Sequence, residues 1–106
     1  MNISELAKAL GLEVDEYREL FDLFVETGRS DLAALEYAIE QGDAEKIAAS
    51  AHSLKGASGN LGFMELHGMA SEIVQEARSN RLEGISESFD EMKKAFETVV
   101  QEVYSA

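Results

Sequence analysis

Residues 44–62 read AEKIAASAHSLKGASGNLG, and one stripe of this segment decides the fold. Its apolar and small residues recur at steps of four, three, four and three, which is the spacing of a helix packed in the seam of a bundle. They are Ile47, Ala51, Leu54, Ser58 and Leu61. We therefore predict a helix over residues 44–60 with one face buried and the other free.

The rest of the chain shows the same period, and no segment alternates like a strand. Similar stripes predict a short helix over residues 3–10 and long helices over 14–41, 63–79 and 85–104. The stretch around Gly28 weakens the middle of the second segment and allows a kink there, although we expect one long, imperfect helix. Short connections favour antiparallel neighbours. The predicted fold is all-α, an antiparallel up-down-up-down four-helix bundle with a short N-terminal helix as a lid.

Composition limits the classes of function that remain. A chain of 106 residues with 45% hydrophobic content supports one domain, which we assign to residues 1–106. The absence of cysteine excludes disulfides and cysteine-ligated metals. A net charge of −12, from 21 acids and nine bases, repels nucleic acid and anionic membranes. With no apolar span and no signal peptide, we expect a cytoplasmic monomer, and Met1 and the short length favour a free-standing protein.

His52 lies on the free face of the predicted helix over residues 44–60. At about 100° per residue, it points about 140° away from the buried stripe, with Ala48, Gly56 and Gly59 within about 40° of it. A lone surface histidine without a role would be the plain reading. Interior glycine costs roughly 1 kcal/mol relative to alanine, so two glycines beside one histidine favour a face kept open for another molecule.

An exposed imidazole can accept a phosphoryl group and release it, because the ring is neutral, nucleophilic and easily protonated near pH 7. Lys55 lies one turn after His52. Its ammonium could offset the roughly −1.5 to −2 charges of such a group, although an ordinary solvated lysine would look the same.

The motif around the histidine is similar to that of histidine-containing phosphotransfer (HPt) domains of two-component phosphorelays, and of the related phosphoacceptor domains of chemotaxis kinases. It consists of His52, Leu54, Lys55, Gly56, Gly59, Leu61, Gly62 and Leu66. The resemblance implies that His52 is the phosphoacceptor, Lys55 its electrostatic support, and Gly56 and Gly59 the clearance for a partner. That partner would be the receiver domain of a response regulator or hybrid kinase, whose aspartate exchanges the phosphoryl group with His52.

The same resemblance implies a phosphotransfer intermediate rather than an enzyme, with neither a cofactor nor a metal of its own. No phosphate-binding loop is evident, because the glycines near His52 fall inside a helix with no strand before them. The receiver is expected to supply Mg²⁺. Chemotaxis kinases place a polar network beside the histidine, whereas the corresponding positions here are Ser71 and Val74. Their identity favours a phosphorelay HPt domain.

Apolar residues near His52 are the candidates for docking this partner, since two acidic domains cannot rely on net charge attraction. They are Leu6, Leu10, Leu12 and Phe63. We expect transient association of moderate affinity.

Two alternatives give His52 another role. An interaction module that has lost phosphotransfer would use the same face for docking alone, but it would be expected to lack the histidine or Lys55. A hydrolase or lyase with His52 as general base would need an orienting carboxylate and a pocket. His67 lies at the edge of an apolar stripe, so we predict no role for it, and a metal shared with His52 would lack the usual carboxylate ligands.

Overall fold

The computed structural model describes residues 2–105 and is helical throughout, with no strand among these residues. Its helices are α1 (Ile3–Ala9), α2 (Val14–Gln41), α3 (Ala44–Asn60), α4 (Met64–Arg78) and α5 (Ile85–Ser105). The all-α class and the predicted set of one short and four long helices are confirmed. The boundaries of α2 and α3 agree with the prediction residue for residue. Those of α1 and α5 differ by one residue at the C-terminal end, and those of α4 by one residue at each end.

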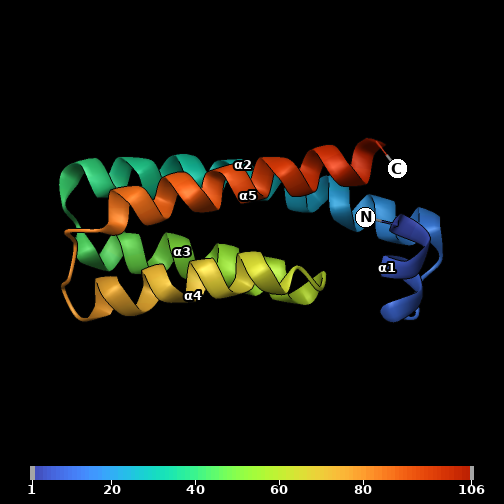
Figure 1. Ribbon diagram of the computed structural model, residues 1–106, viewed down its shortest axis with the longest axis horizontal. Helices are drawn as coiled ribbons and strands as arrows, with labels where there is room; N and C mark the ends of the chain where they lie inside the picture. The colour runs from blue at the N-terminus through green and yellow to red at the C-terminus, as the bar shows by residue number, and fades with distance from the viewer. Residues whose placement is uncertain (1, 106) are drawn as a thin grey trace.

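The four long helices run along the longest dimension of the molecule, which measures 41 Å. Figure 1 shows α2 beside α5 and α3 beside α4, with both chain ends at the same end of the molecule. Contacts join α2 to α3, α3 to α4, α4 to α5 and α5 to α2, so the helices enclose a common core. The α2 and α5 helices extend past the turn between α3 and α4, and α1 folds back on α2 at that end.

The helix ends follow the capping residues in the sequence. The Asn2 side chain accepts a hydrogen bond from the Ser4 amide at 2.8 Å, and Asp43 accepts one from the Lys46 amide at 3.2 Å. Gly42 ends α2 in the left-handed conformation with φ of 65°, which glycine adopts without steric cost. These caps satisfy amides and carbonyls that a helix end leaves free. None of the helices within residues 2–105 is long and apolar enough to cross a membrane.

The core contains the predicted stripe of α3 and a cluster of aromatic rings near the turn between α3 and α4. The four stripe residues within α3 are buried, as is Leu61 directly after it. The hydroxyl of one of them, Ser58, has no hydrogen-bond partner, which makes this position less favourable than a small apolar residue would be. Phe21 stacks on Tyr17, and its ring centroid lies 5.8 Å from those of both Phe24 and Phe63. Burial of each large apolar side chain contributes roughly 1.5–3 kcal/mol.

Gly28 allows α5 to pack closely against α2. The α2 helix is continuous through Gly28, as expected for one long helix. Gly28 is buried, and a Cβ atom placed there would lie 2.5 Å from Cε2 of Phe96 and 2.8 Å from Cζ. Next to this contact, Arg29 pairs with Glu97 of α5 at 2.7 Å. The glycine therefore accommodates a ring from another helix, and its loss of helix propensity is offset by packing.

Replacing Gly28 with alanine should destabilise the fold by about 1–3 kcal/mol, because overpacking a rigid aromatic contact exceeds the gain in helix propensity. Urea unfolding measures the difference. The matched control is Gly68→Ala on α4, where an added Cβ meets no atom within 4 Å and stability should rise by up to about 1 kcal/mol. Equal stabilisation by both substitutions would contradict the assigned role of Gly28.

Candidate functional site

The core determines the direction in which His52 points. Its neighbours in the stripe, Ala51 and Leu54, are each 0% exposed, and His52 itself is exposed on the opposite side of α3. Within residues 2–105 no side chain or backbone group forms a hydrogen bond to its ring. The imidazole therefore reaches solvent in mid-helix with both nitrogens free of protein partners.

An open depression of about 520 Å³ lies beside His52, between the first half of α3 and the end of α4. Its other lining residues are Ala44, Glu45, Ala48, Ala49, Ala77, Arg78 and Asn80. Four of these are alanines, so the floor is low and an incoming group can lie against the helix backbones. Arg78 lies outside the sequence motif, and no role was predicted for it. Its position near His52 depends on how α4 packs along α3, which the sequence pattern does not show.

The two cations of this region are not neutralised by carboxylates. Lys55 is half-buried one turn after His52, and Arg78 is exposed. The ion pair found within residues 2–105 joins Arg29 to Glu97, so neither Lys55 nor Arg78 has an acidic partner within 4.0 Å. Neither side chain would therefore have to break an existing ion pair to contact an anion.

The two glycines beside His52 have different surroundings. A Cβ atom at Gly56 would meet nothing within 4 Å, so there is open space above this residue. At Gly59 the Cβ would lie 2.9 Å from Nδ1 of His67. The predicted clearance above Gly59 is thus occupied by a side chain of the protein itself, and Gly59 does not widen the open face as Gly56 does.

An apolar depression of about 420 Å³ lies between α1, α2 and α3. Its α3 residues begin at Ala57, five positions after His52, or about 8 Å along the helix axis. It is lined by Leu10, Leu12, Leu20, Leu23, Phe24, Thr27, Ala57, Asn60 and Leu61. Leu23 is 56% exposed and Leu20 43%, so both present apolar surface to solvent at this depression.

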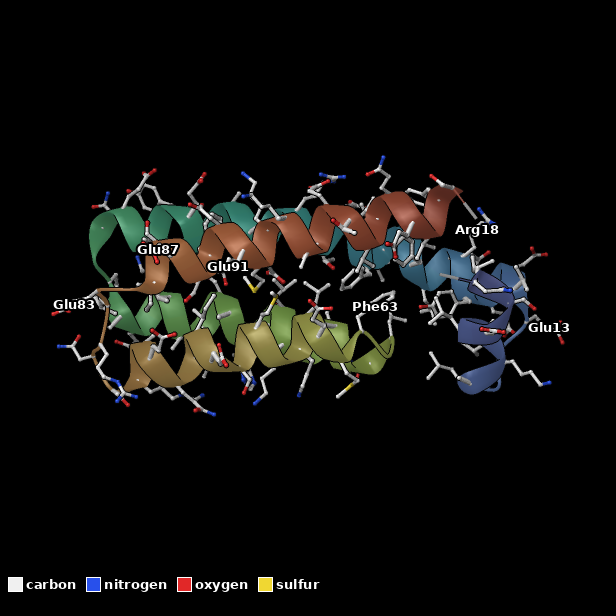
Figure 2. All side chains as sticks on the ribbon, in the orientation of Figure 1. Glu13, Arg18, Phe63, Glu83, Glu87 and Glu91 are labelled. Carbon is white, nitrogen blue, oxygen red and sulfur yellow. The ribbon has the colours of Figure 1, made fainter. Side chains whose placement is uncertain are left out.

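The predicted docking residues do not form one surface. Leu10 and Leu12 line the apolar depression, whereas Leu6 is half-buried and lines a different one between α1, α4 and α5. Phe63 is 5% exposed, and Figure 2 shows it at the start of α4, directed toward α2 and α5. Its ring packs against Phe21 and Phe24, so little of Phe63 is available to a partner. The exposed leucines of α2, Leu20 and Leu23, line the same depression as Leu10 and Leu12 and were not among the predicted residues.

The comparison with known proteins identifies the family. The chain matches the Hpt domain over residues 19–102, which includes all four long helices in whole or large part. It belongs to the Hpt family. The crystal structure of histidine-containing phosphotransfer protein B from Pseudomonas aeruginosa PAO1 is similar, with 34% identity and a TM-score of 0.82. The alignment covers 89% of this chain and 82% of that one. No curated protein matches the chain.

Family membership establishes a histidine phosphotransfer role in two-component signalling. Hpt proteins are carriers without a kinase site of their own. In this Hpt domain, no group of three or more His, Cys, Asp or Glu residues within 2–105 is placed to hold a metal ion.

The α4 positions compared with the chemotaxis kinases do not supply a polar network. Val74 is 2% exposed and belongs to the core, while Ser71 is half-buried and forms no hydrogen bond to His52. Protein contacts within the described residues therefore do not select the tautomer of His52.

Tyr17 holds the end of α3 in this Hpt domain. Its hydroxyl donates to the Leu61 carbonyl at 3.2 Å, where α3 ends. Burial raises the pKa of Tyr17 to about 12, because the phenolate would lose its hydration. The phenol therefore stays protonated near neutral pH and acts as a structural hydrogen-bond donor rather than as an acid or base.

Proposed function

We propose that His52 accepts a phosphoryl group from the aspartate of a receiver domain and returns it to such an aspartate. The observation that carries this assignment is an exposed imidazole without protein hydrogen bonds, beside two cations that lack carboxylate partners. Membership of the Hpt family supports it. The antiparallel up-down-up-down order of the four long helices belongs to the proposal, supported by the short connections and by the contacts between consecutive helices.

The exchange needs one nucleophilic nitrogen and no further group from this chain. The lone pair of one ring nitrogen attacks the phosphorus of the aspartyl phosphate, forming the N–P bond. The P–O bond to the aspartate breaks, and its electron pair stays on the carboxylate. The other ring nitrogen keeps its proton and carries the positive charge. The return transfer is the reverse, and the receiver supplies the Mg²⁺ that neutralises the phosphoryl oxygens.

Lys55 and Arg78 lower the electrostatic cost of this phosphoryl group. It adds roughly −1.5 to −2 charges to a domain whose net charge is already −12, and Glu45 lines the same depression. A charge-assisted hydrogen bond contributes about 1.5–3 kcal/mol. Either cation, once it contacts the phosphoryl oxygens, therefore opposes the repulsion from Glu45.

The receiver docks on the apolar depression next to His52. Leu10, Leu20 and Leu23 provide its exposed apolar surface, with the half-buried Leu12 beside them. Gly56 lies between that surface and the histidine, with open space above it. A partner seated on the leucines can therefore approach His52 across Gly56. Because the carrier and the receiver dissociate after each exchange, we expect their binding to be transient. We also expect the carrier to be a monomer and to act in the cytoplasm.

Substitution of His52 with glutamine should abolish uptake of label from a phosphorylated receiver, because an amide cannot form the N–P bond. The wild-type product should be acid-labile and base-stable. Circular dichroism should show the same helix content for both proteins, since the exposed ring forms no hydrogen bond within the described residues. Uptake of label by the variant would identify His52 as the wrong acceptor. Receiver binding without transfer to the wild type would instead favour a docking module.

Substitution of Gly56 with glutamine should slow transfer at least tenfold, corresponding to about 1.4 kcal/mol, because the new side chain would occupy the open space beside His52. Stability should rise by up to about 1 kcal/mol, since glycine is replaced inside a helix. Initial rates of label transfer and urea unfolding provide the two readouts. Transfer at the wild-type rate would refute the clearance role of Gly56.

Substitution of Leu23 with serine should raise the KM for the receiver about tenfold, because an exposed apolar anchor at an interface contributes on the order of 1–2 kcal/mol. The rate at saturating receiver should change little. Tyr37→Ser is the matched control: Tyr37 lies on the same helix, is 61% exposed and does not line the apolar depression. Equal effects of the two substitutions would place docking elsewhere.

A further inference from the structure

His67 contacts the backbone of the turn that follows His52. It lies in the first turn of α4, half-buried, with Nδ1 at 3.0 Å from the Lys55 carbonyl oxygen. A carbonyl only accepts hydrogen bonds, so Nδ1 carries the proton in this contact. Lys55 comes three residues after His52, and the contact therefore joins α4 to the same helical turn as the phosphoacceptor.

Gly59 provides the space that this contact requires. A Cβ atom at Gly59 would lie 2.9 Å from Nδ1 of His67, 3.4 Å from Cε1 and 3.7 Å from Cγ. The ring thus lies over the glycine, and any larger residue would push it away from the Lys55 carbonyl. Glycine inside a helix is otherwise unfavourable, and the position of His67 accounts for it without any partner.

The same turn is held on its other side by α2. Ser53 Oγ donates to Asp31 Oδ2 at 2.8 Å. The turn from His52 to Lys55 is therefore connected to α2 through a side chain and to α4 through a backbone carbonyl, while the His52 ring itself remains unattached.

We propose that His67 is a positioning residue for this site, an inference that rests on the phosphotransfer role of His52 proposed above. The His67 ring, seated on Gly59 and bonded to the Lys55 carbonyl, sets the distance between α4 and the turn that carries His52 and Lys55. That distance determines where the Lys55 ammonium stands and how close the end of α4, with Arg78, comes to the phosphoryl group. Gly59 is glycine because of His67.

Two substitutions at position 67 separate the hydrogen bond from simple packing. His67→Leu removes the donor and should slow transfer from a phosphorylated receiver about fivefold, the effect expected for one lost hydrogen bond. His67→Asn can place an amide N–H near the position of Nδ1 and should stay within about twofold of wild type on the same basis. Gly68→Ala, with no atom within 4 Å of its added Cβ, serves as the neutral control. A leucine variant at the wild-type rate, or an asparagine variant as slow as leucine, would overturn the proposal.

A double-mutant cycle tests the contact between Gly59 and His67 without any transfer assay. Gly59→Ala should raise Tm by several degrees more in a His67→Ala background than in the wild type, because the added Cβ then meets no imidazole ring. In a domain of this size, each 1 kcal/mol shifts Tm by roughly 4–8 °C. Gly68→Ala should raise Tm equally in both backgrounds. Equal shifts for Gly59→Ala in the two backgrounds would show that the ring does not lie over the glycine.

The outcomes distinguish this inference from the proposed function. If the wild type takes up no label from any phosphorylated receiver, the phosphotransfer proposal fails, and the positioning role fails with it, even if the Tm cycle shows the contact. If the wild type transfers and the cycle shows coupling, but His67→Leu transfers at the wild-type rate, the contact is structural only. In that case the positioning role is rejected and the role of His52 stands.

Discussion

Burial of one stripe of α3 is the constraint on which the site depends. The α3 helix packs against α2 on one side and α4 on the other, so its inward residues cannot rotate without losing the core. Each residue advances the helix by about 100°, and His52 is next to a fully buried alanine. The packing of the core therefore keeps the imidazole outside, and no hydrogen bond to the ring is needed to hold it there.

Helix glycines in this domain have two physical purposes. Gly56 leaves open space on the surface, whereas Gly28 and Gly59 each accommodate a ring from another helix, Phe96 in the first case and His67 in the second. All three lower helix propensity by a similar amount. Only the neighbours of each glycine show whether that loss is offset by internal packing or leaves the surface open.

Local charge and local hydrophobicity, rather than net charge, make this acidic domain suitable for exchanging an anion. Its overall charge of −12 opposes the approach of any phosphorylated partner at long range. At short range, Lys55 and Arg78 are without carboxylate partners, and the exposed leucines of α2 offer an apolar contact that screening by salt does not weaken. The proposed docking therefore relies on a surface that complements the depression rather than on net charge.

The sequence by itself determined the helices, the buried face of α3 and the exposure of His52, because a period of 3.6 residues and the capping residues act within a few positions of the chain. The tertiary structure alone decided which residues meet. It placed Phe63 in the core instead of on a docking surface, joined Leu10 and Leu12 to the leucines of α2, brought Arg78 to the depression beside His52 and set His67 over Gly59. The direction of a side chain from its own helix is a local property, whereas its neighbours depend on how far each helix is shifted along the next. That shift results from the packing of the whole core.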